Sequence, residues 1–367
     1  MHPRRRQLKG WALLGALAFS ATTLAEQDTA QHRYPLPEQG EIVGQTTTVT
    51  ASQDDTLLDL GLGNNVGYNA ITQANPDTSI WLPGEGTEVL LPTRYILPPG
   101  PREGIVINLA ELRLYYYSGE PASVETYPIG IGRMDWKTPL GTTQITAKVE
   151  QPSWYPPQSV IAEHAENGDI LPRVVPPGPD NPLGDYAIIL GIPGYLIHGT
   201  NRPDGVGMRV SHGCIRMLSD DIENLIYRVP KGTTVRLINQ PVKFGWTAEN
   251  LLEIQAYSVP EETPEAKAIR IGKATETAIE QANARGFLID NAILKKELEN
   301  PSGIATSLLL SSRPFPLETT FYDRLLLHYA LYSQLAATVG NTDKLDAEPL
   351  AESVMTAPVE ARPVETR

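Results

Sequence analysis

The sequence contains one cysteine in 367 residues. A single cysteine cannot form an internal disulfide bond, so no covalent crosslink within the chain stabilises the fold. Cys214 is therefore a small buried apolar side chain, a partner for a second chain or a reactive thiol. The count alone leaves these three alternatives open.

Positive charge is also scarce. The chain has 30 lysine and arginine residues against 43 aspartate and glutamate residues, a formal net charge of -13, and its basic residues cluster only at the extreme N-terminus. Proteins that bind nucleic acids through general electrostatics carry a basic surface. We therefore predict no nucleic-acid partner.

Long apolar runs are missing beyond the N-terminus. There, a basic head that ends at Lys9 precedes an apolar run from Trp11 to Ala25, and small residues stand before Glu26. This pattern predicts a secretory signal peptide over residues 1–25, with an uncleaved membrane anchor as the alternative. The mature chain is then expected outside the cytoplasm, where cysteines usually occur in pairs.

Residues 44–93 have the pattern of a small α+β unit. A β-branched run precedes two short helical patterns, and the segment ends in a short predicted strand at residues 87–92. This strand, helix, helix, strand order resembles a divergent LysM module, a small fold that binds wall glycans. A small α+β cap on the next domain is the alternative.

Residues 104–240 are rich in short β-branched and aromatic runs separated by glycine and proline. Such a pattern predicts a mainly β domain, a sandwich or barrel. A proline-rich stretch at 150–185 is too long for a hairpin and is typical of a lid or binding element. One helix is predicted to begin at residues 219–221 and to end before Pro230. The predicted strands are residues 105–108, 112–117, 124–131, 142–149, 186–190, 195–198 and 234–238.

The last third of the chain is predicted to be helical. We expect a helical C-terminal region over residues 247–340 and a disordered tail, rich in alanine, proline and glutamate, over residues 341–367. The helical patterns cover residues 248–255, 264–285, 290–298 and 320–338.

The candidate catalytic residues lie close together in the sequence. His212 and His198 precede the single cysteine, Cys214, by two and by sixteen positions. Imidazole can both accept the thiol proton and stabilise the thiolate, so a cysteine and histidine couple is predicted. His212 is the nearer in sequence, but its approach to Cys214 would be strained, and His198 ends a predicted strand; we favour His198 as the base. Gly213 allows a sharp turn that can present amides to an oxyanion.

Two other interpretations of this cluster stay open. One cysteine and two histidines without an acidic ligand at standard spacing make a poor zinc site. A structural thiol among core histidines is the second alternative. Neither accounts for the concentration of His, Ser, Gly, Cys and Arg in one loop, so we predict no metal and no cofactor.

The segments Ile197-His198-Gly199-Thr200 and Ser211-His212-Gly213-Cys214-Ile215-Arg216-Met217 resemble the signature of the YkuD-type L,D-transpeptidases. The resemblance covers residues 104–240 and is greatest to the Gram-negative periplasmic branch. It implies a β-sandwich fold, Cys214 as nucleophile and His198 as base, oriented by a main-chain carbonyl at or near Gly199. It also implies a supporting loop made of Ser211, His212, Gly213 and Arg216.

The resemblance further implies a reaction, a compartment and partners. Cys214 would form a thioester with the third residue of a peptidoglycan tetrapeptide, release D-alanine and transfer the acyl group to an amine in the periplasm. That amine belongs to a neighbouring stem, giving a 3→3 crosslink, or to a lysine of an outer-membrane lipoprotein. Peptidoglycan stem peptides and glycan are the expected partners. The alternatives are a hydrolase of the same fold, which acts as a carboxypeptidase or releases a lipoprotein, and a non-catalytic wall-binding scaffold.

Overall fold

The computed structural model describes residues 32–119, 121–133, 138–211 and 213–311. The predicted signal peptide, the helix predicted at residues 320–338, the predicted tail and His212 lie outside these ranges. Within them, no helix combines the length and apolar character that crossing a membrane requires.

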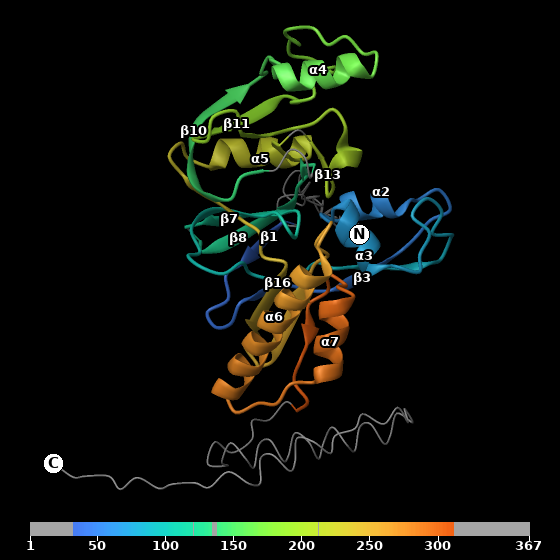
Figure 1. Ribbon diagram of the computed structural model, residues 1–367, viewed down its shortest axis with the longest axis vertical. Helices are drawn as coiled ribbons and strands as arrows, with labels where there is room; N and C mark the ends of the chain where they lie inside the picture. The colour runs from blue at the N-terminus through green and yellow to red at the C-terminus, as the bar shows by residue number, and fades with distance from the viewer. Residues whose placement is uncertain (1–31, 120, 134–137, 212, 312–367) are drawn as a thin grey trace, which may run out of the picture.

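A large curled sheet of nine strands forms the centre of the molecule (Figure 1). Neighbours are antiparallel except for the pairs β15 with β6 and β12 with β14. A core of buried isoleucine, leucine and valine side chains packs against this sheet, and the mainly β prediction is confirmed. In spatial order the strands are β1 (Arg33–Pro35), β8 (Ser123–Pro128), β7 (Arg113–Ser118), β6 (Gly104–Asn108), β15 (Thr234–Ile238), β10 (Gly141–Glu150), β11 (Tyr186–Leu190), β12 (Leu196–His198) and β14 (Ile215–Arg216).

Each predicted strand of the central domain corresponds to an observed strand, but the one predicted over residues 124–131 is divided. β8 ends at Pro128, and β9 (Ile131–Gly132) pairs instead with β13 (Arg209–Ser211). The cause is Gly130, whose amide and carbonyl both pair with the backbone of Arg216 at 2.8 Å. The chain therefore leaves the edge of β7 and crosses to the segment that carries Cys214.

The predicted helix is α5 (Ser219–Arg228), and its apolar face joins the core through Ile222, Leu225 and Ile226. The N-cap residue is Leu218, and the Ser219 hydroxyl donates to the Thr200 carbonyl at 3.1 Å. This hydrogen bond joins the start of the helix to the segment that follows β12.

The proline-rich stretch contains a helix that the sequence analysis missed, α4 (Gln158–Glu166). Only Val160 of this helix is buried, so its sequence lacks the apolar periodicity that identifies a helix. In Figure 1, α4 lies beyond the ends of β10 and β11, at the far end of the molecule from α6.

The N-terminal module contains β3 (Thr47–Thr50), α2 (Leu57–Leu62), α3 (Tyr68–Ala74) and β4 (Glu88–Leu91), the predicted order of elements. β3 and β4 pair antiparallel, and the module has a small apolar core of its own. Thr56 and Asp59 form a capping box at the start of α2. A second antiparallel pair, β2 (Ile42–Gly44) with β5 (Arg94–Ile96), leads from this module into the central sheet.

The C-terminal module is α+β and not purely helical, so the helix predicted at residues 248–255 is wrong. The chain forms β16 (Val242–Trp246), β17 (Leu252–Ala256) and β18 (Thr306–Ser307), covered by α6 (Pro264–Ala284) and α7 (Asn291–Glu299), the two helices predicted there. β17 is buried on both faces. Its apolar residues face α6 and α7, whereas Glu253 forms a bidentate ion pair with Arg94 at 2.8 and 2.9 Å. Because Arg94, which is distant in sequence, pairs with the carboxylate of Glu253, this charged residue can be buried in the central strand of the module.

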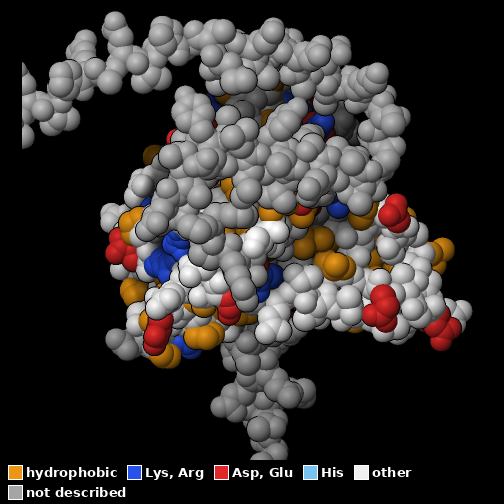
Figure 2. All heavy atoms as spheres, turned by 90° about the horizontal axis from the view of Figure 1, so that it is seen from below, with side chains coloured by type: hydrophobic (Ala, Val, Ile, Leu, Met, Phe, Trp, Pro, Cys, Tyr) orange, Lys and Arg blue, Asp and Glu red, His pale blue; other side chains and the backbone are white. Residues whose placement is uncertain are grey.

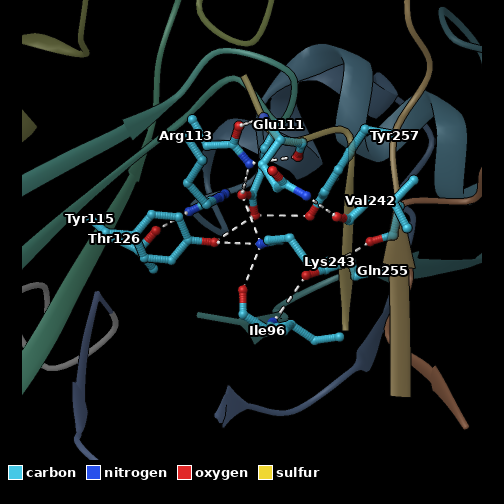
Figure 3. A network of polar contacts seen from close by, with 12 residues as sticks. Ile96, Glu111, Arg113, Tyr115, Thr126, Val242, Lys243, Gln255 and Tyr257 are labelled. Atoms are coloured by element: carbon cyan, nitrogen blue, oxygen red, sulfur yellow. Dashed lines mark hydrogen bonds and ion pairs between the residues drawn. The ribbon is translucent and has the colours of Figure 1, made fainter. Parts of the chain in front are cut away.

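A buried polar network joins the three parts of the chain (Figure 3). Its centre is Glu111, which accepts hydrogen bonds from Lys243 of β16 at 2.8 Å, from the Tyr115 hydroxyl at 2.5 Å and from the Tyr257 hydroxyl at 2.8 Å. Burial alone would raise the pKa of this carboxyl, but these donors and the Lys243 charge hold the pKa below its usual value. Arg113 donates to the Asn65 carbonyl of the N-terminal module at 2.6 Å.

The surface agrees with the acidic composition. Figure 2 shows the described part of one face, on which acidic side chains stand apart along the outer edge of the lobe on the right and the basic side chains form no continuous stripe. Charge of both signs is interspersed with apolar side chains there.

Candidate active site

A cavity of about 730 Å³ contains both members of the predicted couple, Cys214 and His198, in its lining. Ser211 and Arg216 line it as well. Much of the remaining lining comes from the proline-rich stretch, including Trp154, Leu171, Pro172, residues 175–180, Pro182 and Leu183. The sequence analysis named this stretch as a lid or binding element but identified none of its individual lining residues.

Strand pairing brings the two halves of the motif together. β12 and β14 lie parallel, with Ile197 opposite Ile215 and His198 opposite Arg216, and the His198 carbonyl accepts from the Met217 amide at 2.8 Å. Ile197, Ile215 and Met217 are fully buried. Apolar side chains thus anchor both strands in the core, and the polar residues between them are held at the cavity.

His198 is 4% exposed, and its Nδ1 lies 2.6 Å from the carbonyl oxygen of Gly199. A carbonyl can only accept, so Nδ1 carries the proton and the lone pair is on Nε2. Burial, aided by the positive charge of Arg216 and opposed by the Gly199 carbonyl, lowers the pKa of the imidazole to about 4. At neutral pH the side chain is an uncharged imidazole with a free acceptor nitrogen.

Cys214 is half-buried, and burial raises the pKa of its thiol. The thiol donates to the Gly194 carbonyl at 3.7 Å and not to His198. A neutral thiol beside a neutral imidazole is therefore the resting state.

Side chains hold the loop before β14 in place. The Thr138 hydroxyl donates to the Gly213 carbonyl at 2.8 Å, and the Ser211 hydroxyl donates to the Cys214 carbonyl at 2.6 Å. Gly213 has a φ of +105°, a conformation that residues with a side chain rarely adopt. Thr138 was not singled out from the sequence as a site residue.

The described residues contain no group of three or more histidine, cysteine, aspartate or glutamate side chains that could hold a metal ion. The reactive and charged groups among the described lining residues are the Cys214 thiol, the imidazoles of His164 and His198, the Asp180 carboxylate and two arginines, Arg202 and Arg216. Such a set is suited to nucleophilic acyl transfer.

Comparisons with known proteins agree on one family. The model of the L,D-transpeptidase catalytic domain, YkuD, matches residues 102–237. The chain is 45% identical to the probable L,D-transpeptidase ErfK/SrfK of Escherichia coli K12 over 232 residues, which cover 62% of this chain and 74% of that protein. It is 38% identical to the probable L,D-transpeptidase YbiS of the same organism over 306 residues, which cover 80% of this chain and 97% of that protein. The chain belongs to the L,D-transpeptidase family and is an enzyme of that family.

Proposed function

We propose that this enzyme acts in the periplasm on peptidoglycan tetrapeptide stems, with Cys214 as nucleophile and His198 as the proton acceptor and donor. The observation that carries the proposal is that the chain's single cysteine and a buried histidine line the same cavity, and that the Gly199 carbonyl holds Nδ1 of this histidine. That hydrogen bond leaves Nε2 able to take a proton.

In the first half-reaction, Sγ of Cys214 bonds to the carbonyl carbon of the third stem residue while its proton passes to Nε2 of His198. The bond from that carbon to the nitrogen of D-alanine then breaks, and the imidazolium gives the proton to the departing amine. A thioester remains on the enzyme. The low pKa of His198 makes its protonated form a strong acid for this second transfer.

In the second half-reaction, an amine attacks the thioester carbon and gives a proton to His198. The carbon–sulfur bond breaks, and the thiolate takes the proton back. A side-chain amine of a neighbouring stem yields a 3→3 crosslink, and a lysine of an outer-membrane lipoprotein yields a protein attached to the wall. Attack by water yields hydrolysis, which is the alternative function of the same site.

Product analysis tests this proposal. The purified enzyme is incubated with tetrapeptide-rich sacculi, with and without a lipoprotein that ends in lysine, and the muropeptides are separated and weighed by mass spectrometry. We expect release of D-alanine together with a new amide bond, and neither product with Cys214→Ala. Tripeptides without any new amide would instead establish the hydrolase, and unchanged tetrapeptides would refute both.

We also propose that the N-terminal module binds wall glycan. Trp81 and Leu82, in the connection between α3 and β4, are 66% and 72% exposed, and sugars stack on exposed aromatic rings. Trp81→Ala should lower the fraction of enzyme that sediments with sacculi. Tyr227→Ala, which removes an exposed aromatic ring from α5, is the control, and equal sedimentation of both variants would contradict the proposal.

A further inference from the structure

The outer side of the proline-rich stretch carries exposed apolar side chains. Trp154 and Val175 form an antiparallel bridge, with both backbone hydrogen bonds at 2.9 Å, and both residues line the cavity that contains Cys214. Side chains alternate between the two sides of an extended segment, so the next pair, Tyr155 and Val174, points away from the cavity. Accordingly, Tyr155 is 68% exposed and Val174 is 41% exposed, and neither lines the cavity.

Ile170 adds a third apolar side chain to this outer side. It directly precedes Leu171, which lines the cavity, and it is 90% exposed. The fully buried Asn181 holds the stretch in shape, because its side-chain amide donates to three main-chain carbonyls of the stretch, the nearest at 2.7 Å. Tyr155, Ile170 and Val174 form what we call the outer strip, and they stand on a wall of the cavity whose backbone is held in place.

The outer strip can contact only a partner that is larger than a stem peptide. The proposed donor lies in the cavity, on the other side of the same wall. The hydroxyl groups of a glycan need hydrogen-bonding partners, which the side chains of Ile170 and Val174 do not supply. A protein acceptor, by contrast, extends beyond the cavity that receives its lysine, and covering exposed apolar side chains stabilises such a complex. The position and chemistry of the strip therefore favour a protein.

The charge of the same wall indicates the kind of protein. Residues 151–185 contain one arginine, Arg173, and five acidic residues. Glu163 pairs with Arg133 at 2.7 Å, and the other four are exposed, namely Glu166, Asp169, Asp180 and Asp185. This charge attracts a basic segment, such as one that presents a lysine amine, and disfavours an anionic membrane surface.

We propose that Tyr155, Ile170 and Val174 bind a protein acceptor whose lysine stands in a basic segment with apolar side chains. The proposal rests on the proposed function and names the partner of its second half-reaction. Binding at the strip raises the concentration of the lysine amine near the thioester, so that transfer to the protein competes with transfer to a stem or to water. The strip thus selects the acceptor and leaves the formation of the thioester unaffected.

The test compares two acceptors that carry the same lysine, with a tetrapeptide stem as the donor. One acceptor is a lipid-free lipoprotein that ends in lysine, and the other is a tripeptide with the sequence of its last three residues. The amide product of each gives kcat/KM for that acceptor. We expect the wild-type enzyme to prefer the protein, and Tyr155→Ser and Ile170→Ser each to lower kcat/KM for the protein about tenfold, because the burial of one large apolar side chain is lost. Transfer to the tripeptide and release of D-alanine should stay unchanged.

Ile269→Ser is the matched control. Ile269 is 60% exposed and lies on α6, at the end of the molecule far from α4 (Figure 1), so this variant should keep the full preference for the protein. Sedimentation with vesicles of phosphatidylethanolamine and phosphatidylglycerol tests the lipid alternative, and we expect no binding by the wild type. Vesicle binding that Ile170→Ser abolishes, with unchanged transfer to the protein, would assign the strip to a lipid surface and overturn the proposal.

Three further results would overturn the role of the strip while leaving the proposed function intact. They are equal kcat/KM for protein and tripeptide in the wild type, an equal loss on both acceptors in Tyr155→Ser and Ile170→Ser, and transfer to stems without transfer to the protein. A wild-type enzyme that releases no D-alanine would overturn the proposed function and, with it, the choice of acceptor.

Discussion

At the scale of single residues, the state of His198 decides how the site works. Cysteine enzymes can store their thiol as a thiolate beside an imidazolium, but here burial disfavours both charges and the resting pair is neutral. Such an arrangement protects a solitary thiol, since the thiolate is the form that reacts with oxidants and other thiols.

The depressed pKa of His198 predicts a pH-dependent stability. Its value is about 4 in the folded chain and about 6.5 when unfolded, so between these values only the unfolded chain binds the proton. The contribution of His198 to the free energy of unfolding is complete above pH 6.5 and is lost as the pH falls toward 4. The loss amounts to about 3 kcal/mol.

His198→Asn is the comparison, because its side-chain amide can keep the hydrogen bond to Gly199 but does not titrate. Urea unfolding at pH 7 and at pH 4.5 should show a larger loss of the free energy of unfolding in the wild type than in the variant. The same loss in both proteins would mean that His198 titrates normally.

At the scale of elements, the loop between β13 and β14 depends on Thr138, which comes from far away in sequence. Thr138→Val keeps the shape but removes the donor to the Gly213 carbonyl, and an unsatisfied buried carbonyl costs about 1–3 kcal/mol. Because the loop carries Cys214, the proposed nucleophile, we expect kcat/KM to fall about tenfold or more while the fold is retained.

Thr146→Val is the matched control for this substitution. Thr146 also donates to a main-chain carbonyl, that of Ile189 at 3.2 Å, but this carbonyl belongs to β11 and not to the loop that carries Cys214. If both variants lost activity equally, the effect would belong to the loss of a hydrogen bond in general and not to the position of the loop.

Elements with a local signal could be predicted from the sequence, and those that depend on distant partners could not. The short strands of the central domain are bounded by glycine and proline, and α6 and α7 begin with capping residues, Thr263 and Asp290. The helix predicted at 248–255 was wrong although Leu252, Ile254 and Ala256 alternate with Glu253 and Gln255, a pattern typical of a strand. The partners that bury those two polar residues, Arg94 and the backbone of Ile96, lie far away in the chain and leave no local signal.

The residues of the candidate site likewise fall into two groups, those with a local sequence signal and those brought in by the fold. Cys214 and His198 stand in a dense local motif, whose roles stay predictions until they are tested. Trp154 enters the cavity lining only through the return of the proline-rich stretch, and the Thr138 hydroxyl meets the Gly213 carbonyl only because the segment after β9 approaches the loop before β14. Hydrophobic periodicity contains no information on such crossings.

At the scale of the whole molecule, the network around Glu111 makes the three modules one cooperative unit. It is built from the central sheet, from Lys243 of the C-terminal module and, through Arg113, from Asn65 of the N-terminal module. Such a unit would hold the N-terminal module at a constant position relative to the cavity, which suits an enzyme whose substrate is a rigid wall.

Removal of one partner from this network should be costly. Lys243→Met leaves the Glu111 carboxylate buried without its cation, and we expect the free energy of unfolding to fall by about 3–5 kcal/mol in denaturant titrations. Adding Glu111→Gln should recover part of that loss. Lys231→Met, at an exposed lysine, should change stability by less than about 0.5 kcal/mol. Equal effects of the two lysine substitutions would contradict the role of the network.

The central claim is that Cys214 carries the acyl group, and the most direct measurement is the intact mass of the enzyme after reaction with a carbapenem, an acylating inhibitor class that the family implies. Because the chain has one cysteine, no other thiol can carry the adduct. We predict one adduct per wild-type chain, slower formation with His198→Asn and none with Cys214→Ala. An adduct of the same mass on Cys214→Ala would contradict the account.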